Sequence, residues 1–129
     1  MVIFESTLVD TDILIKAYRS DKTKQINLRY LKDKYCVSVV TACELLNGAK
    51  NIHQRVEFSK ALRYYHIALI DETISDTAFS LYKKYSFANK MQISDAFIGA
   101  TVLEHDLLLY TDNKKDFNFI EGIKFYKEK

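Results

Sequence analysis

The segment "LVDTDIL", residues 8–14, decides how the rest of the chain is interpreted, because an apolar strand there ends in two aspartates, Asp10 and Asp12. An ionised carboxylate is destabilised at such a place unless it is solvated, paired or bound to a cation. The segment "LLLYTDNKKDF", residues 107–117, repeats the pattern, since a second apolar strand stops at a threonine and an aspartate. The two strand ends are therefore the first candidates for a functional site.

Short β-rich runs alternate with helical stretches along the chain. The predicted strands are Val2–Val9, Tyr35–Val39, His66–Ile70, Leu107–Tyr110 and Ile123–Tyr126. The predicted helices are Asp12–Tyr18, Thr23–Lys32, Thr41–Asn47, His53–Tyr64, Ile74–Tyr85 and Asp95–His105. This alternation predicts a parallel sheet with helices on both faces. In such a sheet, a ligand binds outside the carboxyl ends of the strands, at the point where the strand order reverses.

Two details of the predicted helices bear on the site. Thr41 and Ser94 are residue types that favour the N-cap, so we expect them to begin the third and the sixth helix. Ala96, Gly99 and Ala100 give the sixth helix a flat face, which allows the close packing that brings its first turn toward the first strand.

Length and composition indicate an ordinary globular protein. The chain has 129 residues, of which 48% are hydrophobic and 28% charged, and we expect a single domain spanning residues 1–129. No stretch reaches the ~18 consecutive apolar residues of a membrane helix, and no signal-peptide pattern is seen. Together with two cysteines in no disulfide or metal-binding pattern, this predicts a cytoplasmic protein. The net charge of +2 permits nucleic-acid binding without arguing for it.

Further acidic residues lie near predicted strand ends or helix starts: Glu44, Asp95, Asp112 and Asp116. Converging carboxylates repel one another unless a divalent cation neutralises them. Hard oxygen ligands of this kind suit Mg²⁺ or Mn²⁺, which also bind substrate phosphates. The chemistry that this set implies is metal-assisted hydrolysis of a phosphodiester.

Each acidic residue also has a purely structural interpretation. For Asp12, we favour an interaction with the positive end of a helix dipole. Glu44 follows Thr41 by three residues, so its carboxylate could instead close a capping box. Asp95 could act on a helix dipole, and Asp112 could simply form a turn. The joint placement of the acids carries the metal-site hypothesis.

The chain also resembles PIN-domain proteins and, among them, the VapC-type toxins of bacterial and archaeal toxin–antitoxin systems. The segments that carry the resemblance are "VDTDILI" (9–15), "SVVTACELLNGAK" (38–50) and "ISDAFIGATVLEHDLLLYTDNKKDFNFIEGIKFY" (93–126). The resemblance covers essentially the whole chain, and its last segment is the most specific. It implies a three-layer α/β/α domain with a central parallel sheet.

The resemblance assigns the three principal acids of the site to Asp10, Glu44 and Asp95, which are expected to bind Mg²⁺ or Mn²⁺. The family's T-x-[D/N]-x-x-[D/H]-F segment places Asn113 at the fourth position and Asp116 after it. These two residues are expected to complete the acidic pocket and to help position the attacking water. The side-chain amide at Asn113 carries no negative charge, so the site has one charge fewer than with an aspartate there. Asp116 either compensates for that charge or only holds the loop.

The resemblance further implies a ribonuclease that acts on RNA and is the toxin of a VapBC-type pair. Its expected partners are a cognate antitoxin and a second copy of the chain in a homodimer. No binding to a membrane is expected. Thr11 is expected to orient the Asp10 carboxylate or a bound phosphate through its hydroxyl. Lys114, near a strand exit, is expected to contact the RNA backbone.

Two other functions remain as alternatives. A receiver-like phospho-switch domain would use Asp71 as its phosphoacceptor and Lys124 as its lysine. Such a domain needs neither Glu44 nor Asp95, whereas the nuclease needs both. The second alternative, an inactive PIN-fold binding module, is suggested by the amide at Asn113.

Overall fold

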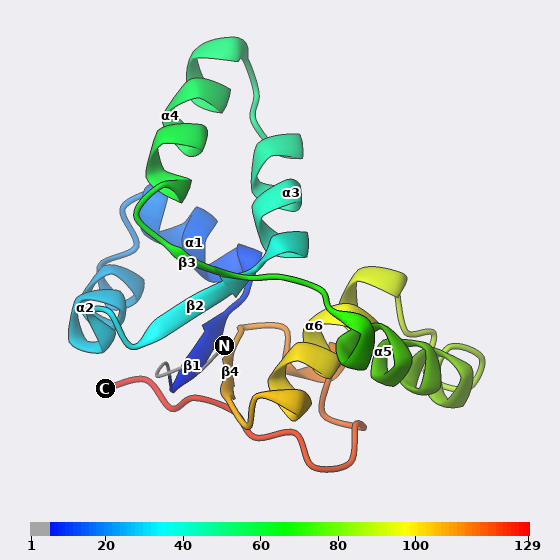
Figure 1. The fold of residues 1–129 in the computed structure, drawn as a ribbon. Coiled ribbons are helices and arrows are strands. Elements are labelled where there is room, and N and C mark those ends of the chain that lie inside the picture. Colours follow the sequence, from blue (N-terminus) through cyan, green and yellow to red (C-terminus); the bar gives the residue numbers. More distant parts are fainter. Residues whose placement is uncertain (1–5) are drawn as a thin grey trace.

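The computed structural model describes residues 6–129, and its centre is a four-stranded sheet in the order β3-β2-β1-β4. The strands are β1 (Thr7–Val9), β2 (Tyr35–Ser38), β3 (His66–Ala68) and β4 (Leu108–Tyr110). Every neighbouring pair of strands is parallel, as predicted. The chain moves outward from β1 to β3 and then returns to place β4 on the other side of β1 (Figure 1).

All six predicted helices are present, with ends that differ from the prediction by at most two residues. They are α1 (Thr11–Tyr18), α2 (Lys22–Leu31), α3 (Val39–Asn47), α4 (Ile52–Leu62), α5 (Glu72–Tyr85) and α6 (Ile93–Glu104). The predicted N-caps are wrong, because α3 and α6 begin two residues earlier than the sequence pattern suggested. Ser38 caps α3 by accepting a hydrogen bond from the Val40 amide at 3.1 Å, and Gln92 precedes α6.

The first and the last predicted strands differ from the strands in the structure. For the predicted strand Val2–Val9, residues 2–5 lie outside the described part of the chain, and β1 covers the rest from Thr7. The predicted strand Ile123–Tyr126 is not a strand but a single parallel bridge between Leu109 and Phe125. Around that bridge the tail makes two backbone hydrogen bonds, from the Leu109 amide at 2.8 Å and to the Leu109 carbonyl at 2.9 Å. Two bonds hold the tail against β4 without extending the ladder.

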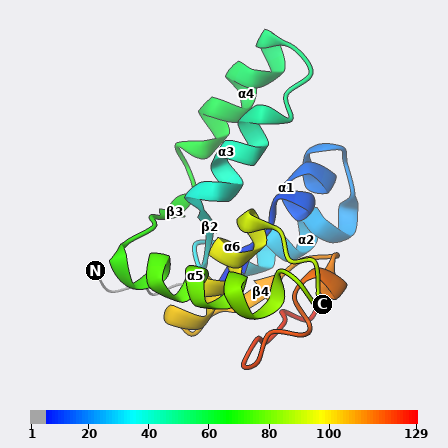
Figure 2. The ribbon, with the colours of Figure 1, turned by 90° about the vertical axis from the view of Figure 1, so that its right-hand side faces the viewer.

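Successive strand residues face opposite layers, which confirms the predicted α/β/α arrangement. Leu8 and Leu109 belong to the hydrophobic cluster that α5 and α6 cover, whereas Val9 and Tyr110 belong to the cluster that α1 and α2 cover. This is the period-2 alternation of a strand buried on both faces. Figure 2 shows the two helix layers on either side of the sheet.

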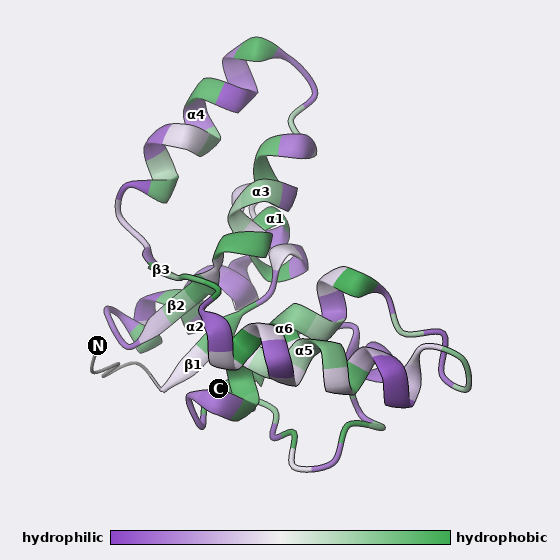
Figure 3. Ribbon diagram, turned by 45° about the vertical axis from the view of Figure 1, so that its right-hand side comes forward, coloured by the Kyte–Doolittle hydropathy of each residue, from purple (hydrophilic) through white to green (hydrophobic). Residues whose placement is uncertain are grey.

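The remaining helices, α3 and α4, form a hairpin that extends away from the sheet (Figures 1 and 2). Figure 3 shows that α4 and α5 mix apolar and polar residues along their length. Within residues 6–129, no helix is both long and apolar enough to cross a membrane.

Candidate metal centre

The candidate site lies at the carboxyl ends of β1 and β4, which are neighbours in the sheet. Asp10 follows β1 and Thr111 follows β4, and the Asp10 amide donates to the Tyr110 carbonyl at 3.0 Å. The strand order reverses between these two strands, because β2 and β3 lie on one side of β1 and β4 on the other. This is the place where a doubly wound sheet binds its ligand.

Asp10 is the most tightly held of the acids, with 8% of its surface exposed. It is the N-cap of α1, and one carboxylate oxygen accepts a hydrogen bond from the Thr11 amide at 2.8 Å. The other oxygen accepts a hydrogen bond from the Thr111 hydroxyl at 2.9 Å. One carboxylate therefore begins a helix and joins the ends of both central strands.

Glu44 enters the site from α3, and its position corrects two expectations. The Thr11 hydroxyl donates to Glu44 Oε1 at 2.8 Å, so this hydroxyl orients Glu44 rather than Asp10. Of the two Thr11 donors, only the backbone amide binds Asp10. The capping-box interpretation of Glu44 is wrong, because α3 begins at Val39 and Ser38 supplies its cap.

Asp95 lies in the first turn of α6. The pKa of Asp95 is raised to about 7, mainly by burial and then by the negative charges of Asp10, Asp116 and Glu44, in that order of importance. Within the described residues, no hydrogen bond holds the Asp95 carboxylate. The charges of the other three acids thus act on Asp95, so the four acids that the sequence assigns to the pocket lie near one another.

The pKa of Asp10 is also raised, but by less than that of Asp95. Its pKa is raised to about 6, because burial and then the charge of Asp12 raise it by more than the hydrogen bonds from Thr11 and Thr111 lower it. Asp95 therefore keeps its proton up to about neutral pH and Asp10 up to about pH 6. Converging carboxylates raise one another's pKa in this way unless a cation neutralises them.

The acidic residues match a hard divalent cation in chemistry and in charge. Their donors are carboxylate oxygens, the ligands that Mg²⁺ and Mn²⁺ prefer, and the charges that act on Asp95 are all negative. Among residues 6–129, no three His, Cys, Asp or Glu side chains already stand in a metal-binding arrangement. The donor set thus fits a cation, and the side chains as they stand do not yet surround one.

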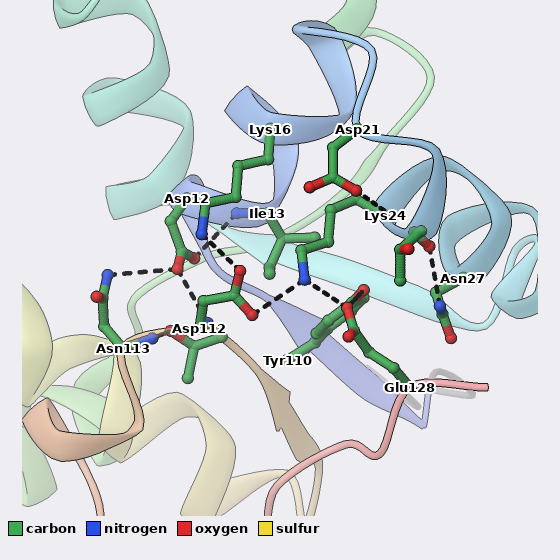
Figure 4. A network of polar contacts seen from close by, with 12 residues as sticks. Asp12, Ile13, Lys16, Asp21, Lys24, Asn27, Tyr110, Asp112, Asn113 and Glu128 are labelled. Carbon is green, nitrogen blue, oxygen red and sulfur yellow. Dashed lines mark hydrogen bonds and ion pairs between the residues drawn. The ribbon is translucent and has the colours of Figure 1, made fainter.

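The loop after β4 brings Asn113 beside this cluster. The backbone amide of Asn113 donates to the Thr111 hydroxyl oxygen at 3.0 Å. The side-chain nitrogen of Asn113 donates to Asp12 Oδ2 at 3.3 Å (Figure 4). Asp116 ends a short 3-10 turn, Lys114–Asp116, that follows. Asp112 points away from the cluster and binds Lys16 at 2.6 Å, which agrees with the motif's choice of Asn113 for the fourth position.

The remaining sequence candidates lie farther from the cluster or have structural roles. The Lys114 ammonium lies 5.7 Å from the centre of the Phe125 ring, above the C-terminal tail. Asp71, the phosphoacceptor of the receiver alternative, caps α5 by accepting a hydrogen bond from the Ile74 amide at 2.8 Å. A capping role accounts for Asp71 without any phosphorylation chemistry.

Sequence reasoning missed the roles of two residues. Asp12 lies in the first turn of α1, as the helix-dipole interpretation requires, and also accepts a hydrogen bond from the Asp112 amide at 2.9 Å. Lys24 was not singled out at all, yet it is buried. The available signal was its spacing, because Lys24 falls three and seven residues before the buried Asn27 and Leu31 of α2.

Comparison with known proteins identifies the family. The family model described as "PIN domain" matches residues 7–121. No curated protein sequence matches the chain closely enough to count as a relative. Among solved structures, a toxin–antitoxin complex from Klebsiella pneumoniae contains a chain 32% identical to this one, with a TM-score of 0.79. The match covers 96% of this chain and 100% of that chain.

Two more distant structures share the fold. In the DNA-bound VapBC from Salmonella typhimurium, the matching chain is 16% identical, with a TM-score of 0.83 and coverage of 95% of this chain and 97% of that one. In VapBC2 from Rickettsia felis bound to a promoter DNA fragment, it is 18% identical, with a TM-score of 0.80 and coverage of 93% and 96%. The motifs, the acidic site at the strand ends and these matches agree: the chain belongs to the PIN-domain family.

Proposed function

We propose that this protein is a divalent-metal-dependent endoribonuclease and the toxin of a VapBC-type toxin–antitoxin pair. The observation that carries the proposal is the set of acids at the ends of β1 and β4, where burial and mutual repulsion raise the pKa of Asp95 to about 7. A hard divalent cation would neutralise the repulsion within an acidic cluster of this kind.

Asp10, Glu44 and Asp95 would hold Mg²⁺ or Mn²⁺. The cation, when bound, polarises the scissile phosphate and stabilises the leaving oxygen. The chain's own hydroxyls orient two of these ligands, since Thr111 donates to Asp10 and Thr11 donates to Glu44. Hydrogen bonds of this type fix ligand orientation and usually matter to metal affinity.

Asn113 and Asp116 complete the pocket in this proposal and position the attacking water. Asp116 contributes negative charge at Asp95, which supports its place in the pocket. The expected substrate contact of Thr11 is not part of the proposal, because its hydroxyl donates to Glu44 and its amide to Asp10. Lys114 contacts the substrate backbone. Lys114 would have to leave the Phe125 ring to do so, a small movement for a flexible side chain.

Protein partners are part of the proposal. The matching chain from Klebsiella pneumoniae belongs to a toxin–antitoxin complex, which supports a cognate antitoxin for this chain. A homodimer is proposed from the family resemblance. A shallow apolar pocket of about 220 Å³ between α5 and α6 exposes Phe79 and Ile93 to solvent, and exposed apolar surface of this kind is typical of protein interfaces.

The testing experiment is cleavage of a total RNA pool by purified protein in Mn²⁺, Mg²⁺ or chelator. We expect cleavage that needs the metal and is lost in Asp95→Asn. Asp76→Asn is the matched control, because it removes the same charge from an exposed position on α5. Equal cleavage by wild type and Asp95→Asn would contradict the proposal, and so would a wild type that cuts no RNA in the pool.

A further inference from the structure

Lys24 is a buried lysine that joins three segments of the chain. It belongs to α2, and only 6% of its surface is exposed. Its ammonium lies 2.5 Å from Glu128 Oε2 in the C-terminal tail and 3.1 Å from Asp112 Oδ1 in the loop after β4 (Figure 4). A buried ammonium is destabilising unless it is paired, so these two carboxylates are required partners.

The charge of Lys24 is retained in this environment. Burial lowers its pKa, but the hydrogen bonds to Glu128 and Asp112 outweigh that effect and leave the pKa above its ordinary value. The same contacts act on the partners, since the hydrogen bonds from Lys16 and Lys24 keep the pKa of Asp112 below its ordinary value despite the opposing effect of burial. The group is a set of ion pairs at neutral pH.

Asp112 carries this pairing into the loop at residues 111–113. Its second carboxylate oxygen binds Lys16 at 2.6 Å, and its backbone amide donates to Asp12 Oδ2 at 2.9 Å. The loop is therefore held from α1 by Lys16 and Asp12 and from α2 by Lys24. Figure 4 shows these residues converging on Asp112.

The same loop supplies a hydrogen bond to the candidate metal centre. The residue before Asp112 is Thr111, whose hydroxyl donates to Asp10 at 2.9 Å. The residue after it is Asn113, whose amide donates to the Thr111 oxygen at 3.0 Å. A displacement of Asp112 would therefore move both neighbours and release the hydrogen bond on Asp10.

The tail fixes Lys24 from the opposite side. Glu128 also accepts a hydrogen bond from the Tyr110 hydroxyl at 2.6 Å, which ties the tail to the end of β4. Without the tail, the Lys24 ammonium would have Asp112 alone to balance its burial.

We propose that Lys24 is a positioning residue for the acidic site: held between Glu128 and Asp112, it keeps the loop at residues 111–113 where the Thr111 hydroxyl reaches Asp10. The proposal rests on the proposed function only in treating Asp10 as a metal ligand. The effect on the loop is independent of any metal or substrate.

The test compares Lys24→Met with wild type by two measurements that need no RNA. The first is hydrogen exchange of the Asp112 and Asn113 amides, with the amides of α5 as an internal reference. We expect the two loop amides to exchange about tenfold faster and the reference to stay unchanged. The second is Mn²⁺ affinity by calorimetry, which we expect to fall about tenfold, in the range seen when residues that orient metal ligands are removed.

Two further variants separate positioning from a general structural effect. Lys24→Arg keeps the charge and two donors for the carboxylates, so it should restore both measurements toward wild type. Lys22→Met removes the same charge from an exposed position on α2 and should change neither. If Lys24→Met does not fold, Glu128→Gln weakens the same pairing from the tail and should speed exchange of the same two loop amides.

Other results of these measurements would overturn either the role of Lys24 or the proposed function. Wild-type exchange and affinity in Lys24→Met would overturn the proposal, and so would an equal acceleration of the loop and the α5 reference, because Lys24 would then support only global stability. A wild type that binds no Mn²⁺ would refute the proposed function. In that case the loop amides alone would still decide whether Lys24 positions Thr111.

Discussion

At the scale of single residues, the site is defined by two aspartates in contrasting surroundings. Asp10 accepts two hydrogen bonds, which partly offset its burial, whereas Asp95 experiences burial and negative charge alone. This difference explains why the pKa of Asp95 reaches about 7 while that of Asp10 stops at about 6. Near neutral pH, Asp95 is the acid most ready to exchange its proton for a cation.

The coupling between the two aspartates can be measured directly. In Asp10→Asn, the charge that follows burial in its effect on Asp95 is gone, so the pKa of Asp95 should fall below about 7. Asparagine is a good N-cap, so α1 should keep its start. Carboxyl carbon NMR titration of the metal-free protein checks this, with Asp76→Asn as control. An unchanged Asp95 pKa would contradict the electrostatic coupling between the two acids.

A second prediction at this scale concerns Asn27, which is fully buried in α2. Its side-chain oxygen accepts from the Tyr126 hydroxyl at 2.7 Å and from the Lys129 amide at 2.8 Å. Asn27→Leu leaves both donors without that acceptor, so the free energy of unfolding should fall by about 1–3 kcal/mol. Urea denaturation measures the change. Tyr126→Phe, which removes only one donor, should lower stability less, and the reverse order would contradict this account.

At the scale of elements, α6 packs closely on its neighbours because it has small residues on one face. A Cβ at Gly99 would lie 3.0 Å from Ile120 Cδ1 and 3.5 Å from Leu81 Cδ1 of α5. This is the flat helix face that the sequence predicted from Ala96, Gly99 and Ala100. Close packing of α6 keeps Asp95, in its first turn, near the ends of the central strands.

Enlarging that face should therefore be destabilising. Gly99→Leu forces its neighbours apart, and overpacking of this kind lowers the free energy of unfolding by about 1–3 kcal/mol. Chemical denaturation checks the stability, and Mn²⁺ affinity should fall in the same variant because Asp95 moves with the helix. Gly48→Ala is the control, since its added Cβ makes ordinary contacts of 3.4 Å or more. A Gly99→Leu variant as stable as wild type would contradict the close packing of Gly99 against Ile120.

The helices and strands were predictable from the sequence to different degrees. Alternating apolar runs predicted the parallel sheet and its site, because parallel strands must end at one edge of the sheet. The tail pattern at Ile123–Tyr126 misled, since alternation reports burial and cannot tell a paired strand from a segment held by one bridge. Contacts such as Lys24 with Glu128, which are 104 residues apart, depend on side-chain reach that no local pattern encodes.

At the scale of the whole molecule, the raised pKa values make stability depend on pH. Between about pH 4 and 7, the folded state of the metal-free protein binds more protons than the unfolded chain, at Asp10 and Asp95. Its free energy of unfolding should therefore fall as pH rises through this window, by an amount on the order of several kcal/mol. Asp112 and Glu128, whose pKa values are lowered, act oppositely, and their stabilisation is lost only as the pH falls below about 4.

Denaturation in urea at pH 5 and pH 7.5 checks this dependence, with and without Mn²⁺. The metal-free wild type should lose stability between the two pH values, and Asp95→Asn should lose less. Saturating Mn²⁺ should raise wild-type stability most at pH 7.5, because binding there displaces the fewest protons. Parallel pH profiles for wild type and Asp95→Asn would contradict the origin assigned to the dependence.

The double role of Asp10 affects how this protein can change over generations. Asp10 begins α1 and joins β1 to the loop after β4, so most replacements there weaken the fold as well as the site. Asp95 is held by no hydrogen bond from the described residues, and neutralising it relieves repulsion. A lineage no longer selected for cleavage should therefore lose the acid at 95 first and keep the acid at 10, leaving a stable and inactive descendant.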